Sequence, residues 1–167
     1  MKYIFLDIDG VLNNENTITK SPDGYMGVAS NLGKRLKKII KATDAKVILT
    51  STWKNCSSTQ DFDYLYRKLN MYSAKPIDVT IDRNNKVSLR GTGIKDYLKK
   101  YPCEQFVILD DYIFDFKEEG LLPHLVLTST TKGLSNDDVK KAIDILNGNI
   151  LDENTYNDEY IWGYHRN

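Results

Sequence analysis

The sequence predicts an α/β fold: a three-layer sandwich with helices on both faces of a central, mostly parallel β-sheet. Short hydrophobic runs alternate along the chain with segments whose apolar residues recur at helical spacing, which is typical of such a sheet. Three of these runs also end in polar functional groups. Because ligand sites of open α/β sheets lie beyond the carboxyl ends of the strands, we expect a functional site along one edge.

The first part of the chain predicts a βαβ unit. Residues 3–6 form the first hydrophobic run, and residues 46–50 (KVILT) form the second. Between them lies a helical stripe of leucines and isoleucines, which begins behind two candidate N-cap residues, Ser30 and Asn31. The later segment VTIDRNNKVSL, residues 79–89, carries strand-forming residues on both sides of two asparagines, and we interpret it as a small hairpin.

The remaining elements continue the alternation. Helices are expected around residues 61–69 and 94–101, and strands at residues 105–109 (QFVIL) and 125–127. A last helix is expected after Ser135, because Asp138 follows three residues later in the pattern of a capping box. We expect the polar, tyrosine-rich residues 148–167 to form a C-terminal tail packed on the surface.

The length of the chain favours a single domain that comprises residues 1–167. The composition gives no overall charge through which a large polyanion would bind. The 167 residues suffice for a hydrophobic core without a disulfide or structural metal. The formal net charge is zero, so no global field attracts nucleic acid or an anionic membrane. Sparse cysteines, Cys56 and Cys103, and the lack of a long apolar run predict a cytoplasmic protein with free thiols and no membrane segment.

Acidic and hydroxyl side chains follow three of the predicted strands. They are Asp7 and Asp9, Thr50 and Ser51, and Asp110 and Asp111. Four carboxylates at one edge would raise one another's pKa values unless a cation were bound. An oxygen-only donor set without clustered His or Cys indicates Mg²⁺, which commonly also binds phosphate oxygens.

The spacing of Asp7 and Asp9 suits phosphoryl transfer. An aspartate can attack phosphorus as a nucleophile, and a second acid must protonate the leaving oxygen. Alternating side chains place residues two apart on the same side of an extended backbone, and Gly10 lets the chain turn away directly afterwards.

These motifs resemble those of the haloacid dehalogenase (HAD) superfamily, whose domains are Rossmann-like. DIDGVL is similar to the first motif of the superfamily, VILTS to the second and FVILDDYIFD to the fourth. The strings TSTWK, RGTGIKDYL and KGLS are most similar to the HAD domain of Swiss Army Knife RNA repair proteins. The resemblance runs from about residue 2 to residue 147, and the short gaps between motifs imply a capless or minimally capped type.

The resemblance implies a role for each site residue. Asp7 is the implied nucleophile and a Mg²⁺ ligand, and Asp9 the general acid/base whose backbone carbonyl also binds the metal. Asp110 and Asp111 are the further metal ligands, and which of them ligates directly is left open. Thr50 is the favoured contact to the phosphoryl group, with Ser51 as the alternative.

Three positions keep two interpretations each. The cation of the third motif is either Arg90, which we favour, or Lys95, one turn further along the helix. Asp115 either supports the metal site or caps a helix. Trp53 either stacks on a nucleobase or belongs to the core.

The leading hypothesis is a Mg²⁺-dependent phosphomonoesterase with an aspartyl-phosphate intermediate. Its expected substrates are nucleotides or the terminal phosphates of nucleic acid, and it is expected to be a monomer or weak dimer. A sugar or other small-metabolite phosphate is the alternative substrate. The alternatives outside catalysis are a receiver-like signalling domain and a binding module with a HAD fold.

Overall fold

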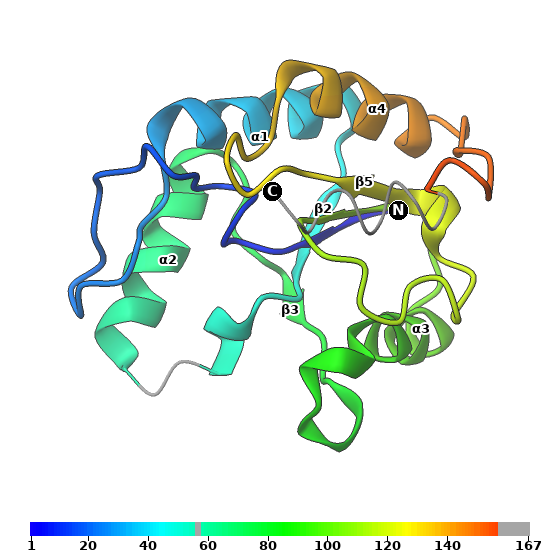
Figure 1. Ribbon diagram of the computed structural model, residues 1–167, viewed down its shortest axis with the longest axis horizontal. Helices are drawn as coiled ribbons and strands as arrows, with labels where there is room; N and C mark the ends of the chain where they lie inside the picture. The colour runs from blue at the N-terminus through cyan, green and yellow to red at the C-terminus, as the bar shows by residue number, and fades with distance from the viewer. Residues whose placement is uncertain (56–57, 157–167) are drawn as a thin grey trace.

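A computed structural model, which describes residues 1–55 and 58–156, confirms the α/β fold (Figure 1). The strands are β1 (Lys2–Leu6), β2 (Lys46–Leu49), β3 (Asp78–Val79), β4 (Gln105–Asp110) and β5 (Leu125–Leu127). The helices are α1 (Ser30–Thr43), α2 (Thr59–Met71), α3 (Arg90–Lys100) and α4 (Asn136–Leu146).

All strand pairs of the sheet are parallel, and the spatial order is β3-β2-β1-β4-β5. The chain therefore adds β2 and β3 on one side of β1, and then β4 and β5 on its other side. The reversal makes the junction of β1 and β4 the topological switch point, beyond whose carboxyl end a ligand is expected. The order also differs from the 2-1-3-4-5 order of receiver domains.

Strand register places the predicted site residues at one level. Leu6 of β1 lies opposite the residues that immediately precede Thr50 and Asp110. The parallel pairing continues past the strand ends, because the backbone N–H of Asp7 donates to the Leu109 carbonyl and that of Thr50 to the Leu6 carbonyl. The strands thus deliver these side chains to the same edge of the sheet.

Two hydrophobic cores sandwich the sheet. Along β1, Ile4 and Leu6 face one core, which is closed by apolar residues of α1, α2 and α4, whereas Tyr3 and Phe5 face the other, closed by α3. In Figure 1, α1 and α4 lie side by side along one face of the sheet, and α3 covers the opposite face. Burial on both faces explains why these strands appear in the sequence as continuous apolar runs.

The hairpin predicted for residues 79–89 is wrong. Val79 pairs in parallel with β2, as part of the short edge strand β3. Asn84 and Asn85 do adopt the left-handed backbone that favours a tight turn, with φ values of 56° and 55°. No ladder forms beside them, because the flanking Ile81 and Val87 are exposed and bury no common face.

The two predicted helix starts have different outcomes. The capping box is confirmed: the Ser135 hydroxyl accepts from the Asp138 backbone N–H, and the Asp138 carboxylate accepts from that of Ser135. The N-caps proposed at Ser30 and Asn31 are wrong, since the N-cap residue is Ala29 and makes no side-chain hydrogen bond.

Residues 13–29 form a flap between β1 and α1 and, like the rest of the described chain, build no separate cap domain. An antiparallel bridge joins Lys20 to Met26 at its tip. The flap is fixed to α2, because the Asp61 carboxylate accepts from the Ser21 hydroxyl at 3.1 Å and from the Asp23 backbone N–H at 3.0 Å. In Figure 1 the flap lies beside α2 at one end of the sheet.

The C-terminal segment packs against β5 as far as it is described. The Tyr156 hydroxyl donates to the Leu125 carbonyl at 2.8 Å and accepts from the Leu127 backbone N–H. The predicted tail residues 157–167 and the predicted free thiol of Cys56 lie outside the described residues. Cys103 is a free thiol. Within the described chain, every helix is too short or too polar to traverse a lipid bilayer.

The caps provide a test of these local assignments. Ser135→Ala is expected to lower the free energy of unfolding by about 1 kcal/mol, because it removes the acceptor for a helix N–H. Ser30→Ala is the matched control and should change it by less than about 0.5 kcal/mol, because this exposed side chain caps nothing. Urea unfolding of both variants measures the difference. A larger loss from Ser30→Ala would contradict the cap assignments.

Candidate active site

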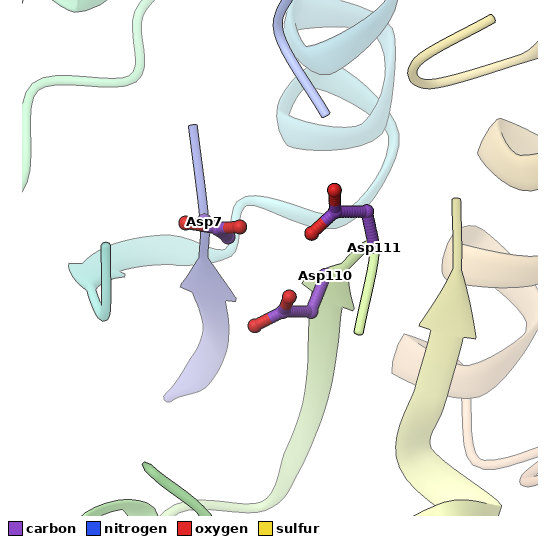
Figure 2. Close-up of side chains that lie close together, drawn as sticks. All are labelled: Asp7, Asp110 and Asp111. Carbon is purple, nitrogen blue, oxygen red and sulfur yellow. The ribbon is translucent and has the colours of Figure 1, made fainter. Parts of the chain in front are cut away.

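Three carboxylates gather where β1 and β4 end. Asp7, Asp110 and Asp111 each offer an oxygen, and these atoms all lie within 4.8 Å of one another. Figure 2 shows the carboxylates of Asp110 and Asp111, at the end of β4, on the side that faces Asp7. Asp7 and Asp110 are buried, and Asp111 is half-buried. Three of the four carboxylates predicted for this edge, Asp7, Asp110 and Asp111, therefore gather at the switch point of the sheet.

The pKa of each of the three carboxyl groups is raised, and burial is the largest cause in every case. Burial raises the pKa of Asp7, although the nearby Arg90 opposes the shift. Burial and the Asp7 charge raise the pKa of Asp110 well above its ordinary value. The same two causes raise the pKa of Asp111 to about 6. A bound cation would relieve this cost.

Arg90 neutralises part of this charge from the first turn of α3. Its guanidinium donates to the Asp110 carboxylate at 2.7 Å and lies 3.4 Å from that of Asp7. Its other face packs on the Phe114 ring, at 4.4 Å from the ring centroid. The side chain is almost fully buried. Arg90 therefore lies where the predicted cation of the third motif is needed.

Lys95, the alternative cation, does not reach this cluster. It lies on another face of α3 and lines a separate cavity of about 320 Å³ together with Phe106 and His124. Of the two candidates for the third motif, the structure brings Arg90 and not Lys95 to the acidic residues.

Of the two roles predicted for Asp115, the structure shows that of a helix cap. Its carboxylate accepts hydrogen bonds from the backbone N–H groups of Gly91 and Thr92 and from the Thr92 hydroxyl. These donors belong to the first turn of α3, which also carries Arg90. Asp115 is therefore not part of the carboxylate cluster and instead fixes the helix end that presents the guanidinium.

Asp9 stands apart from the cluster. One oxygen of its carboxylate accepts from the Asn13 amide at 2.9 Å, and the other accepts from the Trp53 indole N–H at 3.2 Å. The side-chain carboxylate is thus held outside the cluster of Asp7, Asp110 and Asp111, which leaves its backbone carbonyl for the metal role implied by the resemblance. Trp53 packs in the hydrophobic core, which was one of the two positions expected for it.

Gly10 allows the close approach of the two acidic loops. Its φ of +80° lies in the left-handed region, and a Cβ atom there would lie 2.1 Å from a carboxylate oxygen of Asp111. The Asn13 side chain accepts from the backbone N–H of Gly10, and the Thr128 hydroxyl donates to the backbone carbonyl of Gly10 at 2.7 Å. Sequence reasoning predicted the turn but missed Asn13 and Thr128, which hold it in place.

The hydroxyl groups after β2 differ in their partners. The Ser51 hydroxyl accepts from the Trp53 backbone N–H and also hydrogen-bonds with Asp7. The bond to Asp7 opposes part of the rise that burial causes in the pKa of that carboxyl group. The Thr50 hydroxyl is buried and has no partner, and the same holds for Nε of Arg90. Buried polar atoms without partners are costly, so both are consistent with a bound ligand that supplies acceptors.

Lys54 is a site residue that sequence reasoning missed. Its ammonium is buried and donates to the Asp82 carboxylate at 3.0 Å and to the Thr80 hydroxyl at 3.1 Å. Burial lowers its pKa, and the charges of Arg90 and Asp7 are near enough to act on it. The sequence feature that could have identified Lys54 is its position in TSTWK, shortly after a strand that ends at the site.

The electrostatics predict how the metal-free protein responds to pH. Because the folded-state pKa of Asp111 is raised to about 6, the folded protein holds this proton more tightly than the unfolded chain. The stabilisation is complete below the ordinary pKa of 3.8 and is lost as the pH rises through about 6. In EDTA, the melting temperature should therefore fall as the pH rises from about 4 to about 6, and change little above that.

Asp111→Asn should reduce that fall and raise the melting temperature at neutral pH, because it removes one repelling charge. The exposed Asp63→Asn on α2 is the control and should leave the pH dependence unchanged. Identical pH profiles for all three proteins would contradict the assigned repulsion.

Comparisons with known proteins identify the family of this chain. Residues 3–139 match the model of the HAD domain in Swiss Army Knife RNA repair proteins. A solved chain, described as a putative HAD superfamily (subfamily III A) hydrolase from Legionella pneumophila, aligns over 99% of this chain and 90% of its own, with 16% identity and a TM-score of 0.45. The chain matches none of the curated proteins with which it was compared. The family match covers most of the sequence, so the chain belongs to the HAD superfamily, in the family of the Swiss Army Knife HAD domains.

Proposed function

We propose that this protein is a Mg²⁺-dependent phosphomonoesterase that works through an aspartyl-phosphate intermediate. The observation that carries the proposal is the convergence of Asp7, Asp110 and Asp111 within 4.8 Å at the switch point, with Arg90 against two of them. Membership of the HAD superfamily supports hydrolase chemistry.

The donor set fits Mg²⁺. Asp7, Asp110 and Asp111 would hold the ion, together with the backbone carbonyl of Asp9. Hard carboxylate oxygens suit Mg²⁺, and the described residues bring no His or Cys into this cluster. A bound Mg²⁺ would neutralise charge on the carboxylates and on the phosphoryl group.

Asp7 and Asp9 would divide the chemistry between them. A carboxylate oxygen of Asp7 attacks phosphorus and forms an acyl phosphate, while the bond from phosphorus to the leaving oxygen breaks. Asp9 gives its proton to that oxygen, so the alcohol leaves neutral. Asp9 then takes a proton from water, which attacks the same phosphorus. The acyl phosphate bond breaks, inorganic phosphate departs and Asp7 returns to its original state.

The phosphoryl group would be held by the polar atoms that lack partners. The Thr50 hydroxyl and Nε of Arg90 can both donate to phosphate oxygens, and each is buried without an acceptor of its own. Ser51 is less suited to this contact, because its hydroxyl already bonds within the protein. The buried ammonium of Lys54 adds positive potential beside Asp7 and Arg90.

The proposed substrates are nucleoside monophosphates or terminal phosphates of single-stranded nucleic acid, in the cytoplasm. The family resemblance to RNA repair domains supports this class. The lack of a cap domain among the described residues leaves the sheet edge open to such molecules. A zero net charge favours contact with few phosphates.

Substitution of the nucleophile tests the reaction. Asp7→Asn is expected to lower kcat by at least about a thousandfold for every substrate, because it removes the attacking carboxylate. The panel is a chromogenic aryl phosphate, a nucleoside monophosphate, a phosphorylated oligonucleotide and a sugar phosphate, each with Mg²⁺ and with EDTA. Circular dichroism and melting confirm that the variant is folded.

Each arm of this panel has a decisive outcome. Near-normal turnover by folded Asp7→Asn protein would disprove the nucleophile assignment. Full activity in EDTA would overturn the metal assignment. A clear preference in kcat/KM for the sugar phosphate would replace the nucleotide substrate class and leave the chemistry intact.

A paired substitution tests the cation of the third motif. Arg90→Lys should lower kcat/KM by at least about tenfold, because an ammonium cannot reproduce the planar set of guanidinium donors. Lys95→Ala should change it by less than about twofold, because Lys95 lines a different cavity. Steady-state kinetics on the aryl phosphate measure both. A larger loss from Lys95→Ala would reverse the assignment.

A further inference from the structure

A cavity of about 560 Å³ adjoins the Asp9 side of the active site. Its walls come from the flap, from the turn after β2 and from the start of α2. This volume lies within the range of about 300 to 1,000 Å³ that is typical of small-molecule sites. Asp9 lies on the cavity wall, while Asp7 belongs to the carboxylate cluster at the end of β1.

The walls of the cavity are held by hydrogen bonds. Asp61 accepts from the Ser21 hydroxyl and from the Asp23 backbone N–H, which ties the flap to α2. The Trp53 indole N–H, also in the lining, donates to the Asp9 carboxylate. The cavity walls are therefore held by buried and partly buried hydrogen bonds, which anchor the flap to the buried Asp61 side chain of α2.

The charge of the lining is one-sided. Among its described lining residues, three are aspartates, namely Asp9, Asp23 and Asp61, and none is lysine, arginine or histidine. The remaining surface includes the aromatic side chains of Tyr25 and Trp53. Asp61 is fully buried and bonded to the flap, whereas the carboxylates of Asp9 and Asp23 are exposed and can accept hydrogen bonds from the hydroxyl and amino groups of a ligand. Their negative charge repels anions.

We propose that this cavity binds the leaving group and selects an uncharged, hydroxyl-bearing leaving group of nucleoside size over one that carries a second phosphate. The inference rests on the proposed function, since a leaving oxygen protonated by Asp9 must lie beside that carboxylate. The rest of the leaving group then extends into the cavity that Asp9 borders. Ribose hydroxyls can donate to the carboxylates of Asp9 and Asp23, and the exposed ring of Tyr25 offers a surface for a base.

The proposal narrows the substrate class. In an oligonucleotide or a nucleoside bisphosphate, the second phosphate is only one sugar away from the first. It would enter a cavity whose described lining offers no cation to neutralise it. Nucleoside monophosphates should therefore be the better substrates.

The test compares kcat/KM for nucleoside 5′-monophosphate, nucleoside 3′-monophosphate and nucleoside 3′,5′-bisphosphate at fixed salt and Mg²⁺. The better monophosphate should exceed the bisphosphate by at least about tenfold. Asp23→Asn should reduce this ratio severalfold, and Asp23→Lys should reduce it further, because the exposed flap side chain changes charge without loss of a buried contact. Asp63→Asn, an exposed change on α2 outside the cavity lining, should leave the ratio unchanged.

The outcomes separate this inference from the function on which it rests. If the protein hydrolyses no phosphate ester, including the aryl phosphate, the proposed function fails and this inference with it. If the aryl phosphate is hydrolysed but the bisphosphate matches the better monophosphate, only the inference is overturned. The inference alone is also overturned if the aryl phosphate is hydrolysed but no nucleotide is, or if Asp23→Asn and Asp63→Asn change the ratio equally.

Discussion

The repulsion among three carboxylates at the ends of two adjacent parallel strands is the constraint on which the rest of the site depends. Asp7 and Asp110 are buried, and the third, Asp111, comes close only because residue 10 has no Cβ atom. A nearby cation relieves this repulsion. Arg90 supplies one positive charge, and the position of its helix is set by Asp115, which caps the first turn.

The hydrogen bonds that position the second acid also build the surface on which a substrate would lie. Asn13 supports the turn after β1 and, together with Trp53, holds the Asp9 carboxylate away from the other three acidic residues. Trp53 also lines the neighbouring cavity, whose flap is fixed to α2 through Asp61. The separation of the proposed nucleophile from the proposed acid is therefore already present in the fold.

Much of this arrangement could be predicted from sequence because it follows from local pattern and strand register. Apolar runs that end in polar residues locate the strands, and parallel pairing then brings Asp7, Thr50 and Asp110 to one level. The features that could not be predicted depend on partners distant in the sequence. Lys54 is buried only because Asp82 and Thr80 meet it there, and Asp115 caps a helix that begins more than twenty residues earlier. The failed hairpin shows the same limit: its turn forms, but no shared buried face supports the strands.

Chemical trapping of the covalent intermediate tests the central claim most directly. The Asp9→Asn variant can be mixed with Mg²⁺ and an aryl phosphate, whose leaving group needs no protonation, so the acyl phosphate should form and hydrolyse slowly. Acid quenching, borohydride reduction and peptide mass spectrometry then locate the modified carboxyl group. We expect reduction at Asp7 alone, dependent on both substrate and Mg²⁺. Release of the aryl alcohol without modification of Asp7, or with modification at Asp110 or Asp111 instead, would contradict the proposed chemistry.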